Sequence, residues 1–303
     1  MNTPSTAVPE THAVSPEAAL LQAAGPMYWS IRRELWENRS IYLAPLIAAV
    51  VFLFGFLIQM INLRRHVGNT SLVFRPQMES PYDTAALLIM GVAFLVGIFY
   101  TLDALYGERR DRSILFWKSL PVSDVTAVLS KLLIPIAILP LLSFVITIAT
   151  HFAMLALSGV VLIGTGVNVA TLWGHLSFLH FSGMLLYHLV TVHGLWYAPM
   201  YGWLLLVSAW APRAPFLWAF LPPFVIWGVE KLAFNTSYFL AMLQHRLMGP
   251  QSSTATASGS LMDAMAAHSL GEFLSTPGLW IGLAIAAAFL VAAVRLRRYR
   301  GPI

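Results

Sequence analysis

Residues Leu132–Pro212 read LLIPIAILPLLSFVITIATHFAMLALSGVVLIGTGVNVATLWGHLSFLHFSGMLLYHLVTVHGLWYAPMYGWLLLVSAWAP, and these 81 residues contain no Asp, Glu, Lys or Arg. The whole chain of 303 residues is 10% charged and 58% hydrophobic, with a mean hydropathy of +0.73. An average soluble domain carries about 25% charged residues. Low charge with high apolarity also excludes an intrinsically disordered chain. The composition therefore predicts an all-α integral membrane protein with several spans.

Further apolar segments of spanning length lie on both sides of this stretch, and a helix of about 20 residues crosses about 30 Å of hydrocarbon. The six predicted spans are 41–61, 84–106, 132–157, 183–211, 216–231 and 277–294. The fifth is short and contains Pro222 and Pro223, which remove two amide donors and should kink or break the helix. A second crossing directly after it would carry the C-terminus to the outer side. We therefore expect a re-entrant or interfacial element over 232–243, with Glu230 and Lys231 near the outer boundary.

The distribution of basic residues decides how many spans Leu132–Pro212 contains. Two spans place 13 Lys and Arg on the side of the termini and 5 on the other side, whereas a third span over 159–180 gives 10 and 8. Cytoplasmic flanks of membrane spans collect Lys and Arg. We therefore expect six spans with both termini in the cytoplasm, and an uncharged segment at the outer face over 159–182. The same rule accounts for the net charge of +5, so no nucleic acid partner is expected.

The N-terminal 26 residues are rich in Pro, Ala, Ser and Thr and contain no Lys or Arg. They lack the basic start and apolar run of a secretory signal, and we predict a disordered cytoplasmic tail over 1–26. Residues 27–40 predict a short amphipathic helix in the headgroup region. The alternative is an ordinary flank of the first span. The side chains expected at the membrane interface are Trp29, Arg32, Arg33, Leu35 and Trp36.

The loop Tyr106–Leu133, YGERRDRSILFWKSLPVSDVTAVLSKLL, is the most densely charged segment of the chain. A charged run opens it, and Ser113–Leu120 predicts a short helix that ends before Pro121. Ser123 or Asp124 can cap the helix that follows. The pattern fits two interpretations, a docking surface for a cytoplasmic partner or a solvated loop that obeys the positive-inside rule.

The loop also resembles a known family. Its pattern E-R-x-x-x-S, S-L-P-V-S and a Lys leading into a span is similar to that of ABC-2 type transporter permeases, and the matching residues are Glu108, Arg109, Ser113, Ser119, Leu120, Pro121, Val122, Ser123 and Lys131. The interfacial helix, the six spans and the cytoplasmic termini extend the resemblance over about 27–300. It implies the membrane-spanning subunit of an ATP-driven exporter in a bacterial inner membrane. In such permeases the loop carries a coupling helix that docks on a separate ATPase chain.

The resemblance also implies functional positions. The docking residues that it implies are Glu108, Arg109, Arg110, Ser113, Ile114, Trp117, Leu120 and Pro121. The candidates for closing the pathway on the outer side are Pro222, Pro223, Glu230 and Lys231.

The chain contains no G-x-x-x-x-G-K-[ST] motif and no Gly–Lys pair, so it has no P-loop for a nucleotide. We therefore expect no catalysis and no cofactor in this chain, with ATP and Mg²⁺ held by two copies of a partner ATPase. One set of six helices is too small to enclose a wide path. A second permease copy is expected, in a homodimer or a heterodimer.

Titratable residues inside the spans are few. His175–His180 and His188–His193 are spaced by five, whereas helical metal pairs use i, i+4, and the chain has no cysteine. We expect helix-packing histidines and no metal site. Asp103 is costly in hydrocarbon and should face protein or cytoplasmic headgroups, with Arg109 or Arg110 as its ion-pair partner.

Two other functional classes remain open. An ATPase-independent secondary carrier needs titratable groups at mid-membrane, which the charge-free Leu132–Pro212 argues against. A membrane-embedded metal-dependent enzyme needs ligands that converge at one depth. The sequence names no substrate.

Overall fold

The computed structural model describes residues 16–66, 75–119, 122–162, 178–248 and 270–303. All regular structure in these ranges is helical, with no strand among them. Five helical stretches within them are long and apolar enough to cross a membrane: Ser40–Arg65, Pro81–Arg110, Asp124–Val161, Pro215–Phe234 and Pro277–Tyr299. The structure is thus consistent with the all-α, multi-pass membrane protein that the composition predicts.

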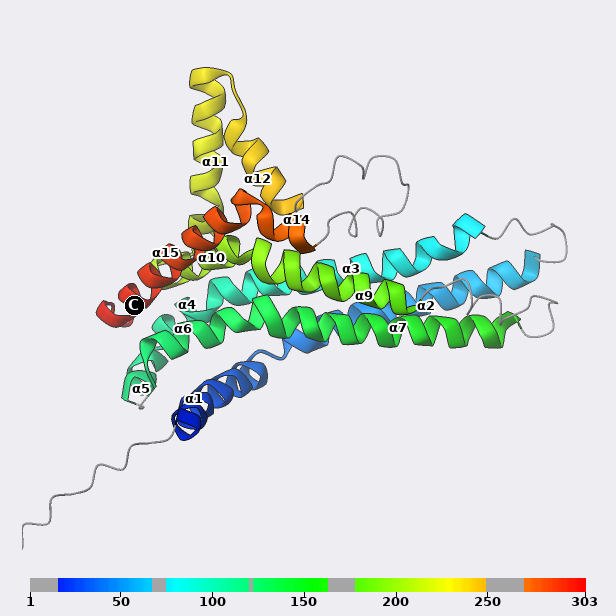
Figure 1. The fold of residues 1–303 in the computed structure, drawn as a ribbon, viewed down its shortest axis with the longest axis horizontal. Helices are drawn as coiled ribbons and strands as arrows, with labels where there is room; N and C mark the ends of the chain where they lie inside the picture. The colour runs from blue at the N-terminus through cyan, green and yellow to red at the C-terminus, as the bar shows by residue number, and fades with distance from the viewer. Residues whose placement is uncertain (1–15, 67–74, 120–121, 163–177, 249–269) are drawn as a thin grey trace, which may run out of the picture.

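The long helices form an elongated bundle, which lies horizontally in Figure 1. α2 (Ser40–His66), α3 (Arg75–Ala104) and α7 (Leu139–Leu162) pack against one another. α6 (Asp124–Leu133) leads into α7 through a π-helical turn, η2 (Ile134–Ile138). The predicted third span therefore continues a helix that begins in the charged loop.

The π-helical turns occur close to prolines. η2 contains Pro135 and is followed by Pro140, and each proline lacks the amide hydrogen that an α-helix requires. The predicted span 183–211 is also helical but changes its winding, with Pro199 at the second residue of its last section. Its sections are α9 (Phe178–His188), η3 (Leu189–Trp196, π-helical) and α10 (Ala198–Trp210). Each section alone is shorter than a membrane span.

α15 (Pro277–Tyr299) packs along α10 and ends the chain at one end of the bundle. Gly202 of α10 permits this approach, because a Cβ at this position would lie 3.3 Å from the carbonyl oxygen of Ala286. Small residues bring helix backbones close together in this way. A short helix, α14 (Leu270–Ser275), precedes α15.

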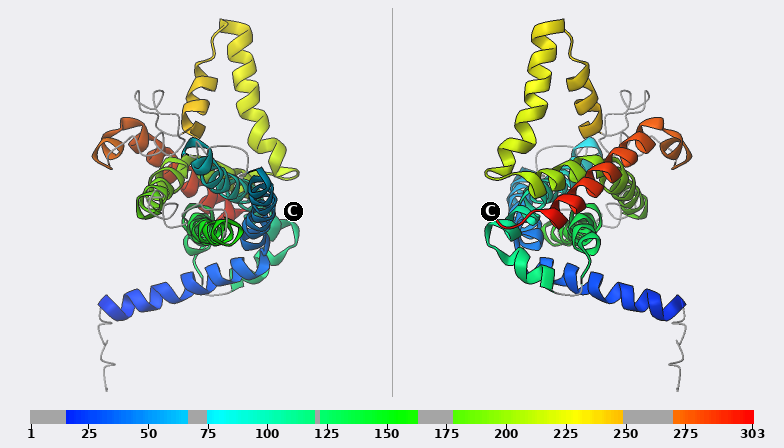
Figure 2. Two further views of the ribbon diagram at one scale, coloured as in Figure 1. Left: turned by 90° about the vertical axis from the view of Figure 1, so that its right-hand side faces the viewer. Right: turned by 90° about the vertical axis from the view of Figure 1, so that its left-hand side faces the viewer.

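α1 (Pro16–Glu37) lies crosswise to the bundle near the end where α15 finishes (Figures 1 and 2). It begins 11 residues before the predicted helix, so the prediction of disorder is wrong for 16–26. Proline suits the first turn of a helix, and Glu17–Ala24 is rich in Ala, Leu and Gln, which are strong helix formers. Residues 1–15 of the predicted tail lie outside the described residues.

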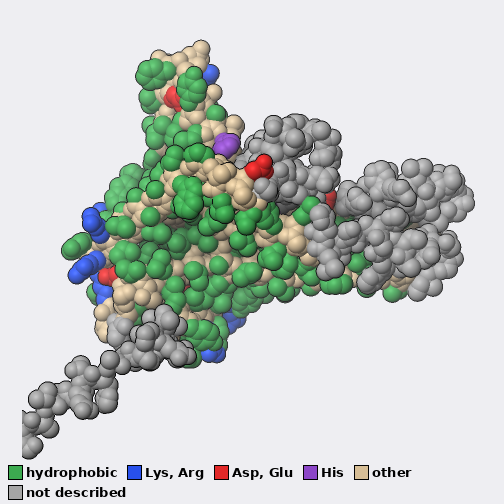
Figure 3. Space-filling model, viewed as in Figure 1, with side chains coloured by type: hydrophobic (Ala, Val, Ile, Leu, Met, Phe, Trp, Pro, Cys, Tyr) green, Lys and Arg blue, Asp and Glu red, His purple; other side chains and the backbone are tan. Residues whose placement is uncertain are grey.

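α11 (Pro215–Phe234) and α12 (Tyr238–Met248) form a hairpin that projects from the side of the bundle (Figures 1 and 2). α11 covers the predicted fifth span but stands across the long helices instead of beside them. α12 overlaps the element expected over 232–243. Hydrophobic side chains cover much of the hairpin and the bundle in Figure 3, and Lys and Arg gather at the end where α15 finishes.

Pro222 and Pro223 were predicted to kink or break the helix, and the break does not occur, because α11 is helical through both residues. Pro223 has no amide hydrogen to bond the carbonyl of Ala219, four residues earlier. Trp203 of α10 supplies the missing donor, since its Nε1 lies 3.1 Å from that carbonyl oxygen. A side chain from the bundle therefore satisfies the acceptor that the proline leaves open.

Candidate functional site

Two short helices follow α3 at the end of the bundle where α15 finishes: α4 (Tyr106–Arg110) and α5 (Ser113–Ser119). The helix is interrupted at Leu105, between α3 and α4. Here the amides of Leu105 and Tyr106 both donate to the Oγ of Ser208 in α10, at 3.0 and 2.9 Å. Arg112 then turns the chain with a φ of 59°. The short helix predicted over Ser113–Leu120 is thus present as α5.

Ser123 caps the next helix, α6. Its Oγ accepts a hydrogen bond from the amide of Thr126 at 3.0 Å, and Asp124 occupies the first turn. Of the two candidates for the cap, the structure confirms Ser123. Leu120 and Pro121, which the resemblance assigns to docking, lie outside the described residues.

Glu108 lies inside the protein, where only 8% of its surface is exposed. Its Oε2 bonds Nη1 of Arg297 in α15 at 2.5 Å. Its Oε1 lies 3.2 Å from Nζ of Lys131 in α6 and 3.3 Å from Nη2 of Arg33 in α1. One carboxylate of α4 therefore joins three other helices.

Glu34 of α1 is a second buried carboxylate at this place. It bonds Lys131 and Arg33, each at 2.7 Å, and accepts a hydrogen bond from the Tyr100 hydroxyl at 2.9 Å. Burial alone raises the pKa of the Glu34 carboxyl, but the charges of Lys131 and Arg33 and the hydrogen bonds from Lys131 and Tyr100 together outweigh it and hold the pKa below the ordinary value of 4.5. Glu34 is therefore ionised at neutral pH.

These groups form one network, which we name the ion cluster. Its members are Arg33, Glu34, Glu108, Asp124, Lys131 and Arg297. The three cations balance the three carboxylates, and Arg297 Nε completes the set by bonding Asp124 at 3.1 Å. Removing one partner of a buried ion pair leaves an uncompensated charge and is strongly destabilising. The ion cluster therefore fastens α1, α4, α6 and α15 to one another.

Arg109 is also buried, and its Nη1 donates to the carbonyls of Ala209 and Ala211 at 2.7 and 3.2 Å. It therefore ties α4 to the C-terminal end of α10. Arg110, in contrast, is exposed and pairs with Asp103 at 3.7 Å. This pairing confirms one of the two partners predicted for Asp103, and excludes Arg109 from that role.

Burial corrects the set of residues expected to face a partner. Glu108 and Arg109 lie in the interior, Ile114 is 1% exposed, and the Ser113 hydroxyl turns back to the Glu108 carbonyl at 3.4 Å. The side chains of α5 that face outward are Leu115, 58% exposed, and Phe116, 59% exposed. Consecutive residues of a helix point about 100° apart, so Ile114, Leu115 and Phe116 cannot share one buried face. That spacing was the signal in the sequence for an apolar outer surface.

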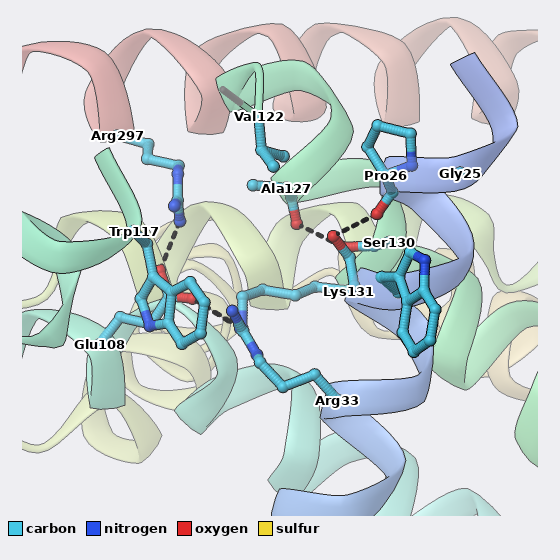
Figure 4. A pocket seen from close by; sticks show the side chains of 12 residues that line it. Gly25, Pro26, Arg33, Glu108, Trp117, Val122, Ala127, Ser130, Lys131 and Arg297 are labelled. Carbon is cyan, nitrogen blue, oxygen red and sulfur yellow. Dashed lines mark hydrogen bonds and ion pairs between the residues drawn. The ribbon is translucent and has the colours of Figure 1, made fainter. Parts of the chain in front are cut away.

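Trp117 connects α5 to α1. The Arg33 guanidinium lies over its ring, with Cζ 3.6 Å from the ring centroid. A cavity of about 470 Å³ opens beside this pair, between α1, α5 and α6 (Figure 4). Trp29 and Val122 form part of its wall, and Lys131 lies at its polar side. The cavity borders the ion cluster directly.

The predicted interfacial residues divide between two faces of α1, and Trp29, Arg32 and Trp36 lie on the more exposed one. Trp29 and Trp36 are exposed, and the Cζ of Arg32 lies 5.2 Å from both indole centroids. Leu35 lies on the opposite face and packs against the core. α1 is therefore amphipathic as predicted, although Arg33 belongs to its inner face.

The predicted outer candidates lie away from the ion cluster, on the hairpin. Glu230 closes the turn between α11 and α12, where its carboxylate accepts from the amides of Tyr238 and Phe239 at 2.6 and 2.9 Å. It also accepts from the Thr236 hydroxyl at 2.9 Å. Lys231 is exposed at the same tip.

The histidines make packing contacts within the described ranges. His151 Nε2 lies 3.1 Å from the Tyr82 carbonyl, and the His188 and His193 rings lie 5.9 Å apart. Among the described residues, no three His, Cys, Asp or Glu side chains converge as a metal site would require. His175 lies outside these residues.

No family model, curated protein or solved structure matches the chain. Its function is therefore to be argued from the geometry of the ion cluster and from the exposed face of α5.

Proposed function

We propose that this chain is the membrane-spanning subunit of an ATP-driven transporter of the ABC-2 permease type, and that a separate P-loop ATPase hydrolyses the ATP. The observation that carries the proposal is the placement of α5. This short helix exposes Leu115 and Phe116, and it is attached on its inner side to the buried ion cluster. An exposed apolar surface on a helix that is bonded to a buried ion-pair network suits a helix that is moved by a partner protein.

Movement of α5 would reach the rest of the bundle through specific bonds. Trp117 stacks on Arg33 of α1, and Lys118 Nζ donates to the carbonyls of Arg298 and Arg300 at the end of α15, at 3.2 and 3.3 Å. α15 in turn packs along α10. Two ATPase chains that bind the permease differently in their two nucleotide states would thereby bias the bundle between two conformations.

The proposed setting is a bacterial inner membrane with six spans and both termini in the cytoplasm. The 13 Lys and Arg on one side, against 5 on the other, support this orientation. The crosswise α1, with Arg32 between two exposed indoles, suits the cytoplasmic headgroup region. In this proposal the helical run α9–η3–α10 is the fourth of the six spans, in addition to the five long helical stretches.

We further propose that a second permease copy completes the transporter. α11 carries large apolar side chains around its whole circumference, and few of them are covered within one chain. Examples are Leu217, Leu221, Phe224 and Val225. Exposed apolar surface of this extent in a projecting hairpin is typical of a surface that packs against lipid or another subunit. We propose that the transporter exports its substrate and that the two permease copies form a homodimer.

The experiment that tests the function is purification with the ATPase encoded next to this chain. We expect co-purification and a rise in ATP turnover when the permease is present. Replacing Leu115 and Phe116 with Asp should abolish both effects. Val125→Asp, at an exposed apolar position of α6 near the same end, is the matched control and should retain them. Failure of the wild-type chain to bind or stimulate the ATPase would remove the proposal.

A further inference from the structure

A second arginine–tryptophan contact lies where α12 returns to the bundle. The Arg246 guanidinium, in the last turn of α12, lies over Trp196 with Cζ 4.3 Å from the ring centroid. Its Nη1 donates to the carbonyl of Gly278, at the start of α15, at 3.1 Å. None of the ion pairs among the described residues gives Arg246 a carboxylate.

Gly282 of α15 provides the space for this guanidinium. A Cβ at Gly282 would overlap Nη2 of Arg246 and lie 2.6 Å from its Cζ, far inside van der Waals contact. Gly278, one turn earlier on the same helix, differs. A Cβ there would meet the Trp196 ring at 3.8 Å, which is an ordinary contact. The notch for Arg246 therefore depends on one glycine, and the neighbouring glycine offers a matched control.

The C-terminal carbonyls of α12 are held at the same place. Trp196 Nε1 donates to the Arg246 carbonyl at 2.9 Å, and the Tyr197 hydroxyl donates to the Leu247 carbonyl at 2.7 Å. The last carbonyls of a helix have no partner inside the helix, so these donors satisfy two of them. Both donors are buried where η3 gives way to α10. Arg246, Trp196, Tyr197 and Gly282 thus form one seat for the end of the hairpin.

Apart from this seat, the bundle holds the hairpin at the base of α11, where Trp203 bonds the Ala219 carbonyl, and the outer part has little support. Leu232, near its tip, is 90% exposed, and Phe234 and Tyr238 are also exposed. The seat relies on a stacking contact and neutral carbonyl acceptors, and Nη2 of Arg246 is buried without a hydrogen-bond partner. Burial accordingly lowers the pKa of Arg246. A contact without a countercharge is easier to separate than a paired one, because no carboxylate is left behind unpaired.

We infer that Arg246 is the positioning residue that fastens the α11–α12 hairpin to α15, and that withdrawal of its guanidinium from the Gly282 notch releases the hairpin. Gly282 and Arg297 are 15 residues apart on α15, about 22 Å along a helix. The seat and the ion cluster therefore act on the same helix from its two ends. The idea that release of the hairpin is a step of transport rests on the proposed function. The fastening of the hairpin by Arg246 does not depend on it.

The chain has no cysteine, which permits a direct distance measurement. Spin labels at Leu232→Cys, near the hairpin tip, and Val291→Cys, on an exposed face of α15, report the position of the hairpin in the full-length protein in lipid nanodiscs. We expect one distance population in the otherwise unchanged chain. Gly282→Ala and Arg246→Ala should each add a second, longer population, and Gly278→Ala should not.

Folding and release are separable in this design. Alanine favours helix more than glycine does, so Gly282→Ala should leave the helical circular dichroism of the protein unchanged while it displaces Arg246. The double variant Gly282→Ala with Arg246→Ala should move the hairpin no further than either single change, because both act on one contact. Equal distances in all variants, or an equal response to Gly278→Ala, would overturn the fastening.

The role in transport has a separate readout. In complexes with the neighbouring ATPase, Gly282→Ala should change the permease-stimulated rate of ATP hydrolysis at least twofold, and Gly278→Ala should not. Equal rates for the two variants, beside a shifted hairpin, would overturn release as a step of the cycle but leave the fastening in place. The distance measurement needs no ATPase, so its result is independent of the proposed function.

Discussion

The ion cluster and the Arg246 seat use the same pair of residue types in opposite ways. In both, an arginine lies over a tryptophan, Arg33 on Trp117 at 3.6 Å and Arg246 on Trp196 at 4.3 Å. Arg33 also bonds three carboxylates, whereas the described ion pairs give Arg246 none. The comparison teaches that the same arginine–tryptophan contact can be held by carboxylates, as at Arg33, or by neutral carbonyls beside a glycine, as at Arg246. Four changes break or sharpen the contrast.

Lys131→Met should produce the largest loss of stability. It removes the cation that lies between Glu34 and Glu108, and breaking a buried ion pair from one side costs about 3–5 kcal/mol. Equilibrium unfolding in detergent micelles measures the effect. Lys231→Met, at an exposed lysine of the hairpin, is the control and should change the free energy of unfolding by less than about 0.5 kcal/mol. Similar losses in both variants would show that the ion cluster is not a fastening.

Acid should weaken the ion cluster less than Lys131→Met does, because protonated Glu34 keeps its shape and some hydrogen bonds. The pKa of Glu34 in the folded protein lies below 4.5, so its carboxylate stabilises the fold at neutral pH. That contribution is lost as the pH falls from 4.5 through the folded value. Thermal unfolding as a function of pH should therefore show a steeper acid decline in the wild type than in Glu34→Gln. If stability in the Glu34→Gln variant fell with acid as steeply as in the wild type, this prediction would be contradicted.

Trp196→Phe should loosen the seat by about 1 kcal/mol, because the aromatic ring remains but the donor to the Arg246 carbonyl is lost. Hydrogen–deuterium exchange of the α12 amides should become faster. Trp280→Phe is the matched control, since its indole donates to the Leu274 carbonyl at 2.9 Å but is exposed, and water can replace it. Unchanged exchange in α12 would show that the indole does not hold the helix end.

Arg32→Gln should have the smallest effect, and only in anionic lipid. Arg32 lies between two exposed indoles, and the described ion pairs give it no carboxylate, so a lipid phosphate is its natural partner. We expect a loss of about 1 kcal/mol of stabilisation by phosphatidylglycerol relative to phosphatidylcholine nanodiscs. Arg33→Gln, one residue later on the inner face, should destabilise the protein equally in both lipids. A lipid-independent effect of Arg32→Gln would remove its assignment to the headgroups.

The sequence predicted the features that depend on local pattern. Charge-free apolar runs predicted the long helices, Ser123 was a recognisable cap, and Asp103 and Arg110 are two turns apart on neighbouring helical segments. Each of these signals lies within a few residues of the feature that it predicts. The same holds for the helix-forming composition of 16–26, which the Pro, Ala, Ser and Thr content of the N-terminal 26 residues led us to interpret as disorder.

The interior of the ion cluster was not predictable, because its partners are far apart in the chain. Glu108 meets Arg33, 75 residues earlier, and Arg297, 189 residues later. A run such as Glu108–Arg109–Arg110 looks equally charged throughout, yet only Arg110 is exposed. The direction of α11 is likewise a tertiary property, since its 20 residues are long enough to cross a membrane and their composition does not specify an orientation.

The bond from Trp203 to the Ala219 carbonyl also bears on the order in which the chain is built. Helix α11 contains two prolines, and one of the acceptors that they leave open is satisfied by a side chain of α10. Since synthesis proceeds from the N-terminus, the indole is made 16 residues before the carbonyl that needs it. The donor for the Ala219 carbonyl is therefore already part of the chain when α11 is synthesised. A chain in which α11 came first would have to wait, with a polar group exposed to hydrocarbon, for its donor to arrive.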